Sequence, residues 1–123
     1  MSERKHLSEI KAEEKGVKNY KKHILICLGP DCTDPEKGKE VWDYLKERLA
    51  AEGLSDTPEA EVYRSKAGCL RICAEGPIAV VYPDGVWYRG VDKTAVDLII
   101  EEHLKGGRVV EKYLLAVNPN FQK

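Results

Sequence analysis

The sequence predicts an α/β protein in which helices flank a mixed sheet, and three observations carry that prediction. Short apolar runs rich in Ile, Leu and Val are typical of buried strands. Between the first two runs lies a longer segment with apolar residues at one-turn spacing, which predicts a helix. A Pro-Asp-Gly turn between two later runs predicts a β-hairpin, and a second helix follows it. The predicted order is therefore strand, helix, strand, hairpin and helix.

The first strand and the first long helix have clear limits. The apolar run over 23–28 predicts a buried strand. Asp34 and Pro35 suit the N-cap and the first position of a helix. Gly53 is a plausible end of this helix. Its buried face is predicted to hold Val41, Trp42, Leu45 and Leu49.

The second half of the chain predicts three more strands and one more helix. Residues 60–64 alternate apolar and charged side chains, as in a half-exposed strand. The runs 78–82 and 86–89 flank the turn of the hairpin. Asp92 is a candidate cap for a helix that Gly106 and Gly107 would end. We expect the apolar residues after Gly107 to dock on the body, in no defined type of structure. The inner face of the last helix is predicted to hold Val96, Ile99, Ile100 and Leu104.

The connections between these elements predict the topology. A right-handed crossover makes the first two strands parallel, and the hairpin adds antiparallel strands to the same sheet. A sheet of about four strands flanked by helices is the thioredoxin-like layout. We predict one such domain over 23–117, with an N-terminal arm over 1–22 and a short tail over 118–123. The arm carries seven Lys or Arg against four Glu and is expected to be flexible apart from a helix around 7–14, which Gly16 interrupts.

Composition narrows the class of protein. The chain has 123 residues, 42% of them hydrophobic, and a formal net charge of −1, which gives no basic field for nucleic acid. Its charged start does not lead into an apolar run, and no apolar stretch is long enough to cross a membrane. We therefore expect a soluble, cytoplasmic protein, in which metal binding is favoured over disulfides for an even number of cysteines.

All four cysteines fall into two tight pairs, Cys27-x4-Cys32 and Cys69-x3-Cys73, at predicted loop positions. Four thiolates suit zinc or an iron–sulfur cluster. A structural zinc site usually has shorter Cys-x2-Cys pairs, and a thiol–disulfide enzyme has Cys-x-x-Cys at a helix start. An iron–sulfur cluster is therefore favoured over a four-cysteine zinc module, although the spacing alone does not choose between two and four irons.

The sequence resembles the thioredoxin-like 2Fe–2S ferredoxins. The resemblance spans roughly 22–116 and is most specific from Cys69 to Tyr88, through Cys-Leu-Arg-Ile-Cys-Ala-Glu-Gly-Pro and the hairpin. It implies a one-electron carrier, commonly a homodimer, in which all four cysteines ligate one 2Fe–2S cluster near the surface. The basic arm and the short first spacing depart from the family pattern.

One alternative shares this fold and cysteine spacing. It is the small 2Fe–2S subunit of multisubunit NADH dehydrogenases, hydrogenases and formate dehydrogenases. That subunit usually has a helical domain before its first cysteine, so we expect a free-standing carrier instead.

We predict no catalytic residue, because the sequence has no Ser/His/Asp set and no nucleotide fingerprint. His6, His23 and His103 are scattered and are not expected to bind metal. The expected partners are redox proteins, each of which binds transiently through a basic patch on its own surface. We expect no nucleic acid or membrane to be involved. The acidic residues expected to meet that patch are Glu36, Glu40, Asp43, Glu47, Glu52, Asp92, Asp97, Glu101 and Glu102.

Overall fold

The computed structural model describes residues 6–30, 33–72 and 74–121. These residues form a five-stranded mixed sheet with strand order β2-β1-β3-β4-β5. β1 pairs in parallel with β2 and antiparallel with β3, and β3, β4 and β5 follow as antiparallel neighbours. The predicted crossover and hairpin are therefore both present. The strands are β1 (Lys22–Cys27), β2 (Val62–Ala67), β3 (Ala79–Tyr82), β4 (Val86–Tyr88) and β5 (Leu114–Val117).

Helix α2 (Pro35–Ala51) begins where the sequence predicts. The side chain of Asp34 accepts a hydrogen bond from the Lys37 amide, and Pro35 occupies the first turn. Its inner side adds one residue to the four predicted apolar ones, because Gly38 is also buried. This face packs on the sheet, so α2 owes its position to burial of one apolar side.

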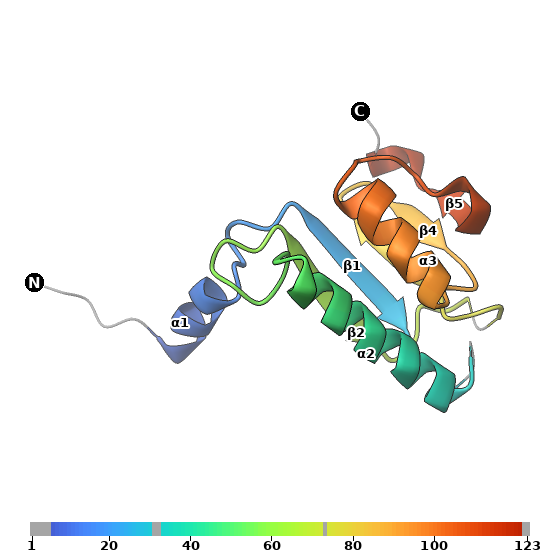
Figure 1. Cartoon of the computed structure of the whole chain (residues 1–123), viewed down its shortest axis with the longest axis horizontal. Helices are drawn as coiled ribbons and strands as arrows, with labels where there is room; N and C mark the ends of the chain where they lie inside the picture. Colours follow the sequence, from blue (N-terminus) through green and yellow to red (C-terminus); the bar gives the residue numbers. More distant parts are fainter. Residues whose placement is uncertain (1–5, 31–32, 73, 122–123) are drawn as a thin grey trace, which may run out of the picture.

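Helix α3 (Lys93–Leu98) is capped by Asp92, which accepts a hydrogen bond of 2.8 Å from the Ala95 amide. It continues into a π-helical segment, η1 (Ile99–Leu104). Figure 1 shows α2 and α3 side by side in front of the sheet. Asp97 joins them, because its carboxylate accepts hydrogen bonds from Tyr44 and from Arg48, both at 2.8 Å.

Among the described residues, α2 and α3 cover one face of the sheet. Ile24, Ile26 and Tyr88 point into the core that α2 and α3 cover. Because side chains alternate along a strand, the neighbouring positions point to the opposite face. The paired row on that opposite face is Leu25, Val80, Trp87 and Ala116.

The N-terminal helix α1 (Leu7–Glu14) lies beside the start of β1 and β2 (Figure 1). Gly16, with φ of +74°, ends it, and a Cβ there would approach the Thr57 carbonyl oxygen to 2.7 Å. Tyr20 then packs on Tyr63, with ring centroids 5.3 Å apart. Contacts over 16–20 thus join α1 to the body of the protein.

Two details of the sheet differ from the prediction. The tail supplies a fifth strand, β5, after the 3₁₀ turn η2 (Glu111–Tyr113), where no structure type was predicted. The second strand, predicted over 60–64, runs over Val62–Ala67 because its pairing with β1 extends to Cys27. The chain ends its described part with the 3₁₀ turn η3 (Pro119–Phe121). No described helix is long and apolar enough to span a membrane.

Candidate metal centre

Cys27 and Cys69 lie at the same end of the sheet. Cys27 is the last residue of β1 and pairs in register with Ala67, the last residue of β2. Cys69 follows Ala67 by two residues. Cys27 is buried, with 3% of its surface exposed, whereas Cys69 is exposed. The parallel pairing of two strands therefore brings one cysteine of each predicted pair to one edge.

The loop after Cys69 returns to Cys27. The Cys27 amide donates a hydrogen bond of 2.8 Å to the carbonyl of Ile78, the first residue beyond Gly76 and Pro77. Cys27 and Ile78 also form a small buried cluster, against which Leu70, Trp87 and Leu115 pack. Both described ends of this loop are thus fixed beside the end of β1.

A hydrogen bond to sulfur organises the loop. The Arg71 amide donates to the Cys69 Sγ atom at 3.2 Å. Arg71 has a φ of +71° and Glu75 a φ of +54°, both in the left-handed region that non-glycine residues seldom adopt. Such strain persists where surrounding contacts require it and is concentrated at functional sites. Neither residue was identified from the sequence, because nothing in the sequence indicates that an Arg or a Glu adopts a left-handed backbone conformation.

Two glycines allow close backbone contacts around the loop that follows Cys27. A Cβ at Gly29 would collide with the Thr33 carbonyl, and a Cβ at Gly38 would come within 2.5 Å of the Leu28 carbonyl oxygen. Gly38 therefore allows α2 to lie directly against the backbone that follows Cys27. A glycine inside a predicted helix was the available signal, because that position needs a packing reason.

Cys32 and Cys73 lie outside the described residues. Within the described part, no three His, Cys, Asp or Glu side chains are grouped as a metal site. The structure thus places two of the four predicted ligands at one edge, and ligation by all four remains a prediction.

The histidines have local roles in the structure. His23 lies between Tyr20 and Tyr63, with ring centroids 5.6 and 5.1 Å away. Burial lowers the pKa of His23. His103 is fully buried and joins Tyr88 and Asp84 by hydrogen bonds of 2.7 and 2.6 Å.

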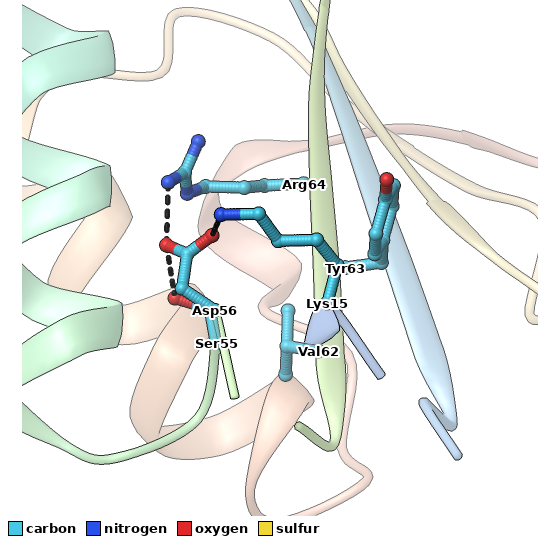
Figure 2. A pocket seen from close by; sticks show the side chains of 6 residues that line it. All are labelled: Lys15, Ser55, Asp56, Val62, Tyr63 and Arg64. Atoms are coloured by element: carbon cyan, nitrogen blue, oxygen red, sulfur yellow. Dashed lines mark hydrogen bonds and ion pairs between the residues drawn. The ribbon is translucent and has the colours of Figure 1, made fainter. Parts of the chain in front are cut away.

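A small polar hollow of about 250 Å³ lies at the start of β2, at the opposite end of the sheet from Cys27 and Cys69. Figure 2 shows the side chains that line it. Asp56 lies at its centre and accepts hydrogen bonds from Arg64 at 2.6 Å and from Lys15 at 3.3 Å. Burial opposes ionisation of Asp56, but the two cations outweigh it, so its pKa lies below the ordinary value. The ion pairs of Asp56 with Lys15 and Arg64 link the end of α1 to β2, so we assign them a structural role.

These features define a class: a thioredoxin-fold protein in which two cysteines, Cys27 and Cys69, lie at one end of the sheet. Comparison with known proteins then gives the family. No family model matches, but the chain is 36% identical over 101 residues to a 2Fe–2S ferredoxin of Clostridium pasteurianum, covering 76% of this chain and 95% of that protein. It is 34% identical to a 2Fe–2S ferredoxin of Aquifex aeolicus, over 77% of this chain and 89% of the relative.

A solved structure agrees with both relatives. The fold is similar to that of a thioredoxin-like 2Fe–2S ferredoxin from Aquifex aeolicus, with a TM-score of 0.69, 31% identity, and coverage of 81% of this chain and 94% of the other. The chain belongs to the thioredoxin-like 2Fe–2S ferredoxin family, as the cysteine spacing and the hairpin sequence predict.

Proposed function

We propose that this protein is a one-electron carrier, a ferredoxin that holds one 2Fe–2S cluster through Cys27, Cys32, Cys69 and Cys73. The observation that carries the proposal is the position of Cys27 and Cys69 at one end of the sheet. Cys27 ends β1, and Cys69 lies in the loop that follows the paired strand β2. Membership of the ferredoxin family supports it.

The described residues suit such a cluster. Thiolates are the ligands that iron–sulfur clusters use. The exposure of Cys69 supports a cluster near the protein surface, where a partner can approach. The Arg71 amide donates toward sulfur and would stabilise negative charge there. A bound 2Fe–2S cluster supplies a one-electron couple, whose potential rises with hydrogen bonds to its sulfurs.

Electron transfer needs no substrate chemistry, so we infer that the protein is not an enzyme. We also place it in the cytoplasm, where reducing conditions preserve thiolates. Its redox partners dock transiently, and salt weakens the contact. Glu36, Glu40 and Glu47 on α2 are exposed and suit a basic patch on the partner. Asp97 and Glu101 suit it less well, because they already pair with Arg48.

We further propose that the protein is a homodimer, as the family resemblance implies. The sheet face without helices supports this. A hollow of about 480 Å³ on β4 and β5 is lined by Trp87, Leu115 and Ile72, and Ile72 is 41% exposed. A second copy would cover this apolar surface.

Iron analysis tests the function directly. Protein purified without oxygen should be red-brown, with about two irons and two sulfides per chain. Reduction with dithionite should give the paramagnetic signal of a one-electron-reduced binuclear cluster. A colourless protein with one bound zinc would refute the proposal.

Single substitutions test the ligands. Cys27→Ala, Cys32→Ala, Cys69→Ala and Cys73→Ala should each lose or strongly destabilise the cluster, since each removes one thiolate. Ser55→Ala, at a buried position at the other end of the sheet, is the control and should keep the iron content. If one cysteine variant retained the normal spectrum and stability, that cysteine would not be a ligand.

A further inference from the structure

A hollow of about 460 Å³ lies between α2 and the edge strand β2, at the cysteine end of the sheet. Its apolar lining is Leu28, Pro35 and Trp42. Leu28 follows Cys27 directly, and Lys66, which also lines the hollow, pairs in register with Ile26. A group bound in this hollow would therefore lie beside the backbone that carries the first predicted ligand.

The charged lining of the hollow is mostly basic. It consists of Lys39, Lys46, Lys66 and a single acid, Asp43. Lys39 and Lys46 share that acid, with Nζ to carboxylate distances of 2.8 and 3.5 Å. The hydrogen bond with Asp43 raises the pKa of Lys39, and the same bond lowers the pKa of Asp43. By formal charge, three lysines and one aspartate give the lining an excess of two positive charges.

Protection of an edge strand does not explain all three lysines of the hollow. A lysine on an exposed edge, such as Lys66, discourages the addition of another strand. That reason does not extend to α2, where Lys39 and Lys46 are two turns apart and lie on the side that lines the same hollow. Three lysines from two elements therefore line one hollow, in a protein whose formal net charge is −1.

The shape of the hollow selects the kind of anion. Trp42 is only 7% exposed, and the Arg64 guanidinium lies 5.2 Å from the centroid of its ring. Little ring surface remains on which a flat aromatic ligand could stack. A compact carboxylate on an aliphatic stem fits better, because the stem can contact Leu28 and Pro35 while its charge meets the lysines.

We propose that this hollow receives an Asp or Glu side chain from the protein that exchanges electrons with this ferredoxin; the proposal rests on the function proposed above. Glu36 and Glu40, on the same helix, would meet basic residues of that partner. Two contacts of opposite sign at the cysteine end would fix the orientation of the partner, because only one orientation satisfies both.

A paramagnetic anion tests the site without depending on electron transfer. Hexacyanochromate(III) is added to the oxidised protein at about 0.1 M salt, and line broadening is followed in the NMR spectrum. The signals of residues 39, 46 and 66 should broaden first. Hexaamminechromium(III), a cation of similar size, should spare them. A short oligoglutamate peptide should displace the anion, and an oligolysine peptide should not.

Charge-removing variants give the matched comparison. Lys39→Gln and Lys66→Gln should each weaken binding of the anion about threefold, as expected for loss of one nearby charge in water. Lys18→Gln, in the exposed segment after α1, should leave binding unchanged. Equal effects of the three variants, no broadening at the hollow, or failure of oligoglutamate to displace the anion would overturn the proposal. The visible spectrum of the same samples tests the cluster separately, since a colourless sample that binds the anion refutes only the proposed function.

Discussion

Gly38 shows how one residue fixes the position of a loop. A glycine inside a helix costs about 1 kcal/mol relative to alanine, so helix propensity alone favours its replacement. Here the missing side chain lets α2 lie against the backbone of Leu28, next to Cys27. The sequence also has a glycine directly before Cys69, but a Cβ at Gly68 would meet no atom within 4 Å. Close contact therefore requires glycine at position 38 but not at position 68.

We therefore predict opposite outcomes for two glycine-to-alanine changes. Gly38→Ala should destabilise the protein by about 1–3 kcal/mol, the usual cost of overpacking, and should lower the iron retained per chain. Gly68→Ala, the control, should change neither quantity measurably. Denaturant unfolding and iron analysis of the purified variants measure both effects. An unchanged Gly38→Ala protein would mean that α2 can shift away from Leu28 at no cost.

At the residue scale, the cysteines could be predicted from the sequence and their surroundings could not. The spacing of the two cysteine pairs can be read from the sequence alone, and it predicts a thiolate metal site. Arg71 leaves none, because its role depends on a left-handed backbone that directs its amide toward Cys69. The same holds for the lysines around Trp42, which come from two elements and converge only after β2 pairs with β1.

At the scale of elements, a partly buried chain of hydrogen bonds joins the sheet to η1. Lys22 and His103 both donate to Asp84, each at 2.6 Å, and the Val110 amide donates to the Tyr88 hydroxyl at 3.1 Å. Since the ionised Asp84 only accepts, His103 Nε2 carries its proton and Nδ1 accepts from Tyr88. Burial raises the pKa of Tyr88 to about 12, which keeps its hydroxyl protonated.

This chain predicts how stability depends on pH. Burial lowers the pKa of His103 below its ordinary 6.5, and the hydrogen bond to Asp84 offsets only part of the effect. Below that ordinary value the unfolded chain binds a proton that the folded protein does not, so the free energy of unfolding falls as the pH falls. The slope from one such group is at most about 1.4 kcal/mol per pH unit.

His103→Gln should flatten this slope, measured by denaturant unfolding between about pH 7.5 and 5.5. It should also cost about 1–3 kcal/mol at neutral pH, because it disturbs buried hydrogen bonds. His6→Gln, at an exposed position, is the control and should retain the slope of the parent protein. If both variants kept the same slope, His103 would already be protonated in the folded state. His23, whose pKa burial also lowers, should contribute to the slope that remains.

The elements with local signals could be predicted, and those defined by distant partners could not. Asp34, Pro35 and the apolar spacing identified α2, and the Pro-Asp-Gly turn identified the hairpin. β5 has no such signal, because it is a short edge strand whose pairing with β4 is interrupted by an irregularity at Trp87 and Tyr88. The limits of β2 likewise depend on its register with β1.

For the whole molecule, the apolar hollow on the sheet face without described helices predicts a dimer. Light scattering should give twice the 13.9 kDa mass of one chain. Leu115→Glu should shift the protein toward the monomer, because it places a charge in the apolar hollow beside Trp87 and Ile72. Leu7→Glu, on the exposed side of α1 at the other end of the sheet, should leave the mass unchanged. A mass of one chain for the parent protein would refute the dimer.

Purification from native cells separates a free carrier from a subunit of a larger complex. A carrier should be recovered alone at high salt, since its contacts with partners are electrostatic. Recovery in fixed stoichiometry with a flavin-bearing or iron–sulfur-bearing protein under those conditions would favour the subunit. The fold and the cysteine assignment would stand in either case.

The order of strands also determines when the protein can fold during synthesis. β1 emerges from the ribosome first, yet its two neighbours, β2 and β3, are made later. β1 can therefore pair with β2 once residue 67 has been translated, but its pairing with β3 has to wait for residue 82. β5 is translated last and joins only the far edge of the sheet. Both neighbours of β1, the strand that ends at Cys27, thus precede the C-terminal strand in synthesis.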